Sequence, residues 1–215
     1  MTDVHCHVER PGTARQFLIG RDFAGIHPWE TLEKGSVPGE TIAEIAGRLE
    51  ADEDLGVGEI GLDRLKNRDI SPVMRETFAL QLELAAKFNR PVVLHGAKCW
   101  GQVVAQCKPF AGRIPAFLFH GFSRSDGLLG DIAAMNGYVS VGPAVLNDHA
   151  VNYRKLVVKI PAERLLVETD CTDENATECP AVEEVARKLA ELRGMTCEEL
   201  EALTDSNAER FRGTN

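Results

Sequence analysis

Short apolar runs alternate with amphipathic segments along the whole chain. The apolar runs predict strands at residues 2–7, 17–26, 57–60, 91–95, 114–120, 138–141 and 165–170. Between them, apolar residues recur three and four positions apart, the spacing typical of helices that bury one face. No signal for an antiparallel hairpin interrupts this alternation in the sequence. The order therefore indicates parallel βαβ units.

The predicted helices begin and end at recognisable residues. Ser71 followed by Pro72 is typical of a helix start, and Asn89 before Pro91 is typical of a helix end. Thr196 with Glu199 has the pattern of a capping box that opens the last helix. We expect helices at 39–52, 72–89, around 100–107, around 128–133, 148–160, 180–194 and from 196 onward.

This order of elements favours one fold class, a TIM-type parallel β/α barrel that is distorted and has about seven strands. A length of 215 residues is enough for one such barrel. The sequence contains no low-complexity linker, fixed repeat or shift in composition. We therefore expect residues 1–215 to form a single domain.

Composition and charge narrow the classes of function. Hydrophobic residues make up 44% and charged residues 27% of the chain, as in ordinary enzymes. The net charge of -9 argues against a basic surface that coats nucleic acid, but bound divalent metals would still allow a phosphate substrate. The cysteines form no C-x-x-C pair, and no apolar run is long enough to cross a bilayer. We expect a cytoplasmic protein with reduced thiols, no membrane attachment and no obligate protein partner.

Histidines and carboxylates stand where the predicted strands end. His5 and His7 are separated by one residue, so they point to the same side of the first strand. The later strand ends carry His27, Glu59, His95, His120 and Asp170. The C-terminal ends of parallel barrel strands meet at one face, where active sites form. A single histidine there is usually a packed core residue, but five of the six histidines at such positions indicate a metal centre.

The number and type of these residues favour two divalent ions. Histidine with carboxylate suits zinc, manganese, iron or nickel better than calcium, and the identity stays open among these and magnesium. Six ligands exceed what one catalytic ion needs, because such an ion keeps a coordination position open. Two ions bridged by a carboxylate would lower the pKa of a bridging water and hold the attacking and leaving oxygens of a displacement.

Six short motifs occur in a recognisable order. They are Asp3-Val4-His5-Cys6-His7, Gly25-Ile26-His27-Pro28, Gly58-Glu59-Ile60-Gly61-Leu62-Asp63, Pro91-Val92-Val93-Leu94-His95, His120-Gly121-Phe122 and Glu168-Thr169-Asp170. Together they resemble the TatD-like deoxyribonucleases, a branch of the metal-dependent amidohydrolase-like superfamily. The resemblance spans nearly the whole chain. It implies a TIM-type barrel, a pair of divalent metals and hydrolysis of DNA phosphodiester bonds, often exonucleolytic from the 3′ end.

The resemblance also implies a role for each residue. Its metal ligands would be His5, His7 and Asp170 for one ion, His95 and His120 for the other, and Glu59 as the bridge. Asp170 would also orient or deprotonate the attacking water, so Asp170 and Glu59 are the implied catalytic residues. His27 would face the substrate.

Three departures from the usual pattern keep the substrate open. Only residues 8–26 separate His7 from His27, too few for the usual helix, strand and helix, so one βα unit is expected to be missing. Ala97 stands where typical members have an arginine, and Cys171-Thr172-Asp173-Glu174 replaces a small residue, a proline and an aromatic. The expected partners are DNA ends or a small phosphodiester. The alternatives are hydrolysis of another small phosphoester, an amide or a lactone, and non-catalytic metal binding.

Four cations follow strand ends and could contact phosphate. Lys98 and Arg64 are the predicted substrate-binding cations, and Lys66 and Arg124 have similar positions. A charged loop residue is more often simply solvated.

Four other residues near the predicted site could contribute to it. Asp63 either lies near the metals or caps a turn. Glu168 lies on the same strand face as Asp170, where it could orient a histidine. Trp29 and Trp100 either stack on a base or pack the loops. The cysteines beside the predicted ligands are expected to be packed thiols.

Overall fold

A computed structural model describes residues 1–12, 14–66 and 68–213. Its strands are β1 (Thr2–Cys6), β2 (Arg15–Leu18), β3 (Phe23–Ala24), β4 (Gly56–Asp63), β5 (Val92–Ala97), β6 (Phe117–Phe119), β7 (Gly137–Val141) and β8 (Leu165–Val167). Its α-helices are α1 (Pro28–Lys34), α2 (Gly39–Ala51), α3 (Pro72–Phe88), α4 (Trp100–Cys107), α5 (Leu129–Ala134), α6 (Val151–Lys159), α7 (Val182–Arg193) and α8 (Cys197–Arg212). Short 3-10 turns are η1 (Lys108–Phe110), η2 (Asp126–Leu128), η3 (Pro143–Leu146) and η4 (Ala162–Arg164).

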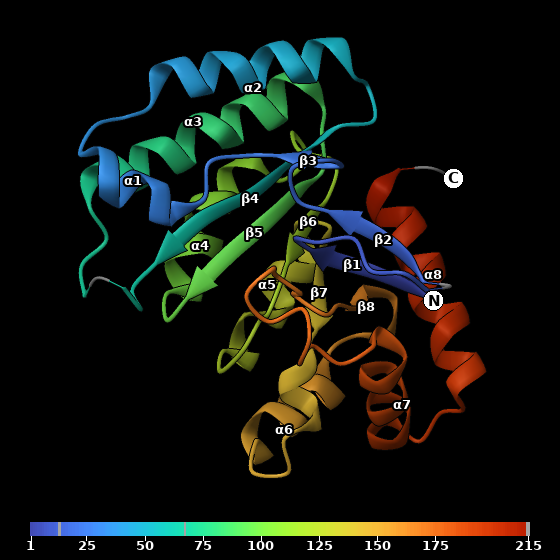
Figure 1. The fold of residues 1–215 in the computed structure, drawn as a ribbon. Helices are drawn as coiled ribbons and strands as arrows, with labels where there is room; N and C mark the ends of the chain where they lie inside the picture. The colour runs from blue at the N-terminus through green and yellow to red at the C-terminus, as the bar shows by residue number, and fades with distance from the viewer. Residues whose placement is uncertain (13, 67, 214–215) are drawn as a thin grey trace.

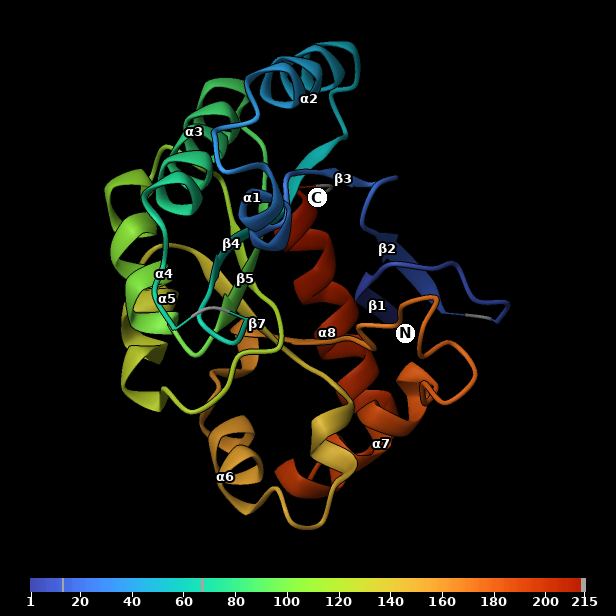
Figure 2. The ribbon, with the colours of Figure 1, turned by 60° about the vertical axis from the view of Figure 1, so that its left-hand side comes forward.

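The strands form two parallel sheets. One contains β3-β4-β5-β6-β7-β8 in that order, and the other pairs β1 with β2. The long strands β4 and β5 run side by side in Figure 1. Figure 2 shows α3, α4, α5, α6 and α7 following one another around the outside of the six-stranded sheet. The α/β class and the TIM-type arrangement predicted from the sequence are confirmed.

The β1-β2 sheet approaches both edges of the six-stranded sheet, but no continuous ladder of backbone hydrogen bonds joins the two sheets. At one edge, a parallel bridge joins Ile19 to Phe23, and the turn between them contains Gly20 at φ +93°. At the other edge, the Asp170 N–H donates to the His5 carbonyl at 3.0 Å, and the His7 N–H donates to the Cys171 carbonyl at 2.7 Å. The ring of strands is therefore distorted and not closed by strand pairing. The predicted second strand, residues 17–26, is divided into β2 and β3, which accounts for eight strands instead of seven.

The connection between β1 and β2 is short. Residues 7–14 join these parallel strands, and the described part of that connection contains no helix. By contrast, a helix separates each of the consecutive strands from β4 to β8. The prediction that a whole βα unit is missing near the N-terminus is therefore only partly right. Strand β2 is present, and it is helices that the described residues between β1 and β3 lack.

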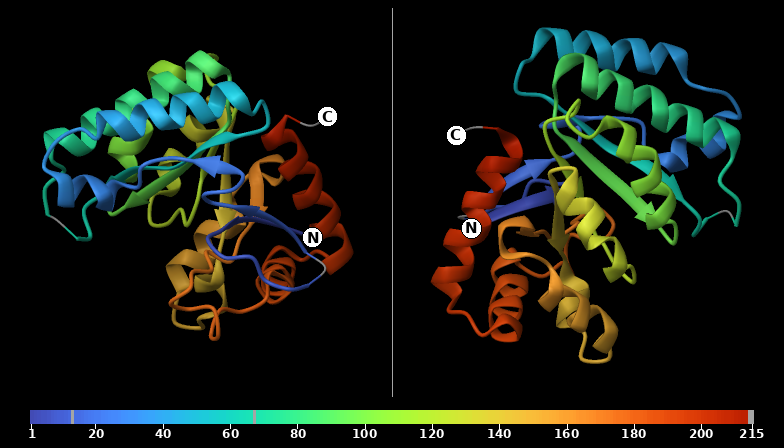
Figure 3. Two further views of the ribbon diagram at one scale, coloured as in Figure 1. Left: turned by 45° about the horizontal axis from the view of Figure 1, so that its top comes forward. Right: turned by 180° about the vertical axis from the view of Figure 1, so that it is seen from behind.

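Helix ends and packing follow the sequence signals. The Ser71 hydroxyl accepts the Met74 N–H at 3.1 Å, and Asn89 ends α3 at φ +54°. Thr196 and Glu199 form the predicted capping box of α8. Figure 3 shows α2 beside α3, and α8 next to β1. None of the helices in the described residues has the length and apolar character needed to span a membrane.

Several predicted boundaries differ from the structure. Strand β5 continues past His95 to Ala97, so His95 lies inside the strand instead of ending it. β4 continues past Ile60 to Asp63, so Glu59 lies inside the strand instead of ending it, because Gly61 and Leu62 still pair with β5. β6 and β8 are shorter than predicted, and Asp170 lies three residues beyond β8. Helix α6 begins at Val151 instead of 148, since the 3-10 turn η3 and an Asn147 turn precede it. Helix α1 was not predicted.

Candidate metal centre

Glu59 is at the centre of the predicted site. Its side chain projects from the middle of β4 and is 3% exposed. Oε1 lies 2.7 Å from both His95 Nδ1 and His120 Nε2. Oε2 lies 3.4 Å from His5 Nε2 and 3.3 Å from His7 Nε2. The two carboxylate oxygens therefore face two separate groups of histidines.

Close approach of β4 and β5 places Glu59 beside His95. Gly61 adopts φ +150°, and a Cβ there would lie 2.1 Å from the His95 carbonyl oxygen. Only glycine fits this conformation and this contact. Gly61 thus allows the two strands to bring the carboxylate and the imidazole together.

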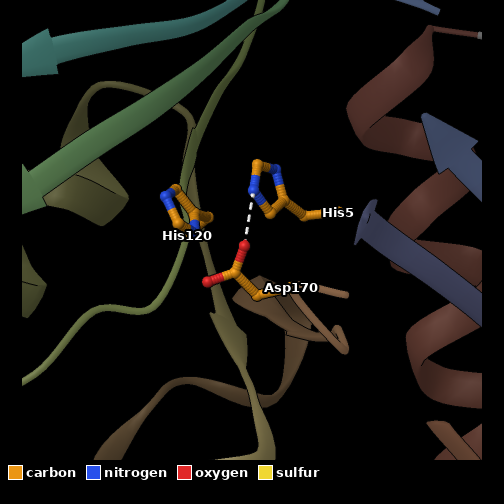
Figure 4. A group of neighbouring side chains, drawn as sticks. All are labelled: His5, His120 and Asp170. Atoms are coloured by element: carbon orange, nitrogen blue, oxygen red, sulfur yellow. Dashed lines mark ion pairs between the residues drawn. The ribbon is translucent and has the colours of Figure 1, made fainter. Parts of the chain in front are cut away.

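His5, His7 and Asp170 form the group on the Oε2 side. Asp170 Oδ1 lies 3.4 Å from His5 Nε2 and 3.6 Å from His7 Nε2. Burial raises the pKa of Asp170, but contacts with both histidines outweigh burial and hold it well below the usual range. Hydrogen bonds to Asp170 and Glu59 raise the pKa of His7 to about 9. Figure 4 shows Asp170 directed at His5.

His95 lies between two carboxylates. Its Nδ1 faces Glu59 at 2.7 Å, and its Nε2 lies 2.9 Å from Asp63 Oδ2. Asp63 is held in turn by the Trp29 indole N–H at 2.8 Å and by the Lys66 N–H at 3.0 Å. Donation from His95 Nε2–H to Asp63 leaves Nδ1 with a free lone pair. Histidines that bind metal commonly donate their other ring N–H to a carboxylate in this way. Burial lowers the pKa of His95, but the two carboxylates outweigh it and raise the pKa.

His120 contacts Glu59 Oε1, the same oxygen that His95 contacts, and its ring stacks on that of His5. The two ring centroids are 3.9 Å apart and the ring planes are nearly parallel. Figure 4 shows the two side chains next to each other. Glu168 lies behind His120, with Oε1 3.8 Å from Nδ1, and is fixed by the Gly121 N–H at 2.7 Å and the Ser140 hydroxyl. Burial lowers the pKa of His120, but the charge of Glu59 and contact with Glu168 raise it well above the usual value.

His27 differs from the other four histidines because it caps a helix. Its Nδ1 accepts the Trp29 N–H at 3.2 Å, and its own N–H donates to Glu30 at 2.9 Å. Its Nε2 lies 3.4 Å from Glu59 Oε1. An Nδ1 that accepts a hydrogen bond carries no proton, so the neutral ring carries its proton on Nε2.

The side chains fit a metal. Neither ring nitrogen of the fully buried His5 has a hydrogen-bond partner, and His120 Nδ1 lacks one as well. A buried polar atom without a partner costs about 1–3 kcal/mol. A bound cation would remove this cost at His5 Nε2, the unpartnered nitrogen that faces Glu59 and Asp170. Three groups of residues have ligand atoms close enough to share an ion: His5, His120 and Asp170; His5, His7 and Glu59; and His27, Glu59 and His95.

Three pockets border this centre, and two of them include its histidines. The third has a volume of about 1050 Å³ and is lined by Arg124, Glu168 and Asp170 among others. The first, here called the metal pocket, has a volume of about 610 Å³. It is lined by His7, Ile19, Gly25, His27, Trp29, Glu30, Glu59, His95, His120, Asp170, Thr172, Asp173 and Glu174. The second, here called the cationic pocket, has about 650 Å³ and shares His95, His120 and Asp170 with the first. Its walls also include Lys98 and Arg124. Substrate can therefore reach the histidines from two sides.

The other predicted residues divide between site and surroundings. Lys98 lines the cationic pocket, whereas the Arg64 Nε–H donates to the Arg68 carbonyl at 2.8 Å. The Lys66 ammonium covers the Trp29 ring at 3.6 Å. Trp100 is 5% exposed and packs between Phe119 and Phe122, so it is a packing residue. Cys6 and Cys171 are buried, as expected for packed thiols.

Sequence reasoning left two contacts unresolved. Asp63 has two sequence interpretations, a place near the metals or a turn cap. It caps the following turn by accepting backbone N–H groups, and it also contacts His95, a predicted ligand. The cap made by His27 was missed, although His27-Pro28 followed by Glu30 carries the signal of a helix start.

The family comparison covers most of the chain. Residues 21–213 match the family model described as TatD related DNase. This range excludes β1 and β2, but relatives align over more of the sequence. The metal-dependent hydrolase YabD of Bacillus subtilis is 29% identical over 94% of this chain and 84% of its own length. The 3'-5' ssDNA/RNA exonuclease TatD of Escherichia coli is 26% identical over 93% of this chain and 80% of its own length.

Solved structures agree with the fold. The TatD homologue YJJV from Escherichia coli superposes with a TM-score of 0.82 at 23% identity, over 98% of this chain and 96% of that chain. A TatD family hydrolase from Entamoeba histolytica gives 0.74 at 17% identity, over 92% of this chain and 75% of that one. With the match of the family model, the order of motifs and the convergence of their side chains, these similarities lead to one conclusion: the chain belongs to the TatD-related DNase family of metal-dependent hydrolases.

Proposed function

We propose that this protein is a divalent-metal-dependent phosphodiesterase that removes nucleotides from the 3′ end of single-stranded DNA or RNA. The observation that carries the proposal is the position of Glu59, whose two oxygens face separate histidine groups. Relatives named as 3'-5' ssDNA/RNA exonucleases support this substrate class.

The geometry supports two ion positions, one on each side of Glu59. His5, His7 and Asp170 would hold one ion, and His95 and His120 the other, with Glu59 as the bridge. When bound, the ions would supply positive charge for the phosphate and lower the pKa of water at the site. Zinc, manganese, iron, nickel and magnesium are all compatible with oxygen and imidazole ligands of this kind.

His27 is proposed as a substrate-binding residue and not as a ligand. Because its Nδ1 is occupied by the Trp29 N–H, its Nε2 carries the proton and is a donor. A donor at the edge of the metal pocket can bind a phosphate oxygen, whereas a metal ligand needs a lone pair. The hydrogen bond from the Trp29 N–H to His27 Nδ1 also fixes the imidazole at the start of α1.

Asp170 is proposed to orient and deprotonate the attacking water. It lies at the point shared by the metal pocket and the cationic pocket, and 48% of its side chain is exposed. A carboxylate in that place touches both the histidine group and incoming substrate. Asp63 and Glu168 are positioning residues, because they act through His95 and His120. A substrate role for Arg64 stays a prediction, since its guanidinium contacts Arg68.

The test is an activity screen on protein of measured metal content. Metal-loaded enzyme would be incubated with a single-stranded oligonucleotide labelled at its 5′ end and with bis(p-nitrophenyl) phosphate. An amide and a lactone would be the control substrates. We expect a ladder of products that shortens from the 3′ end. Hydrolysis of the amide or lactone without any cleavage of phosphodiesters would refute the proposal and favour a small-molecule hydrolase.

A further inference from the structure

Backbone strain is concentrated around the cationic pocket. Five described residues other than glycine have positive φ: Asn89, Lys98, Arg124, Asn136 and Asp170. The two asparagines follow helices α3 and α5, where this conformation is common. The remaining three all line the cationic pocket. Left-handed backbone at a residue with a long or charged side chain is unfavourable and is typical of functional sites.

The loops hold two cations without acidic partners. Lys98 lies between β5 and α4, Arg124 lies between β6 and α5, and both are exposed. Neither makes an ion pair with a described residue. Elsewhere on the surface, Lys108 and Lys188 each pair with a carboxylate at 2.9 Å. In a chain of net charge -9, two unpaired cations in one pocket indicate an anionic ligand.

The two pockets differ in charge. Apart from Asp170, no carboxylate lines the cationic pocket among the described residues, and Ser123 and Ser125 add hydroxyls. The metal pocket has no lysine or arginine among its described lining residues, and Glu30, Asp173 and Glu174 form its outer rim. A polyanion at the metal centre is therefore attracted toward the cationic pocket and repelled from the acidic rim.

We propose that Lys98 and Arg124 bind the phosphate next to the scissile phosphodiester, so that the retained strand of a single-stranded polynucleotide lies in the cationic pocket. This inference rests on the proposed phosphodiesterase activity. It assigns the preference for a polynucleotide over a small phosphodiester to the phosphate next to the scissile one. A small phosphodiester has no second phosphate to fill this subsite. The volume of about 650 Å³ is in the range that holds a small ligand such as a nucleotide.

The experiment compares Lys98→Gln, Arg124→Gln and the wild type on a short oligothymidylate and on bis(p-nitrophenyl) phosphate. The measured quantity is the ratio of kcat/KM for the two substrates, at several salt concentrations. Each substitution is expected to reduce this ratio about tenfold, as loss of a charged hydrogen bond would. Each should also reduce the slope of log kcat/KM against log salt by about 0.7, the value for one phosphate contact on a single strand.

Matched variants separate charge from folding. Arg187→Gln removes an exposed cation of α7 that lies outside both pockets, and it should leave ratio and slope unchanged. Lys98→Arg and Arg124→Lys keep the charge and should retain most of the ratio. Melting temperature and metal content of every variant show whether the fold and the metal centre are intact.

The outcomes distinguish this inference from the proposed function. Cleavage of oligothymidylate with an unchanged ratio and salt slope in both glutamine variants would overturn the cationic subsite and leave the phosphodiesterase intact. Absence of hydrolysis of either phosphodiester by the metal-loaded wild type would overturn the proposed function and the subsite with it.

Discussion

Replacement of Glu59 by glutamine is the perturbation whose effect the geometry defines best. Oε1 lies 2.7 Å from two imidazole nitrogens, and Oε2 lies 3.3–3.4 Å from two others. Glutamine keeps the shape but offers one oxygen and one NH₂ group, which donates hydrogen bonds and does not bind a cation. One of the two ion positions therefore loses a ligand, and the other exchanges a carboxylate for a neutral carbonyl.

The expected magnitude follows from the role of charge. A metal ion contributes several kcal/mol to the stabilisation of a phosphoryl transition state. Loss of about 3 kcal/mol corresponds to a fall in turnover of roughly a hundredfold or more. We expect Glu59→Gln to bind one ion or fewer per chain and to lose turnover by at least that factor.

The assay measures metal content by mass spectrometry after gel filtration, together with melting temperature and phosphodiester turnover on the same preparation. Glu44→Gln is the matched control, because Glu44 is exposed on α2 and outside both pockets. An unchanged metal content and unchanged turnover in Glu59→Gln would refute the bridging role of this carboxylate.

Three further predictions concern the same centre. Asp170→Asn should reduce kcat about a hundredfold with little change in KM, as loss of a general base does; near-normal turnover with both metals bound would remove Asp170 from the mechanism. Asp63→Asn should weaken metal affinity about 10- to 100-fold through His95, which calorimetric titration would detect, and equal affinity in variant and wild type would contradict a positioning role. Chelation should abolish activity and lower the melting temperature, because an ion that binds only the folded state stabilises it; activity that survives exhaustive dialysis against chelator would argue against a metal-dependent reaction.

Much of the fold is encoded in local sequence signals. The ends of α3 and α8 follow from Ser71, Asn89 and Thr196, whose side chains or backbone conformations act within a few residues. The division of residues 17–26 was not predictable in this way. It depends on Gly20 in a turn and on Phe23 joining the β4 edge, a contact with a strand more than thirty residues away.

The candidate site was predictable where each side chain is attached to a strand. His5, Glu59 and His95 follow apolar runs, and parallel strands bring such residues to one face. Contacts between separate loops were not predictable. Lys98 and Arg124 follow strand ends, so a place near the site was expected. That both line one pocket, each with left-handed backbone, is not indicated by a local pattern in the sequence.

A crystal structure of the manganese- or zinc-loaded protein, with anomalous scattering recorded at the metal edge, tests the central claim most directly. The account predicts two anomalous peaks about 3.5–4 Å apart. One peak would lie near Glu59 Oε2 with His5, His7 and Asp170, and the other near Oε1 with His95 and His120. A single peak, or two peaks that Glu59 does not touch, would contradict the binuclear centre.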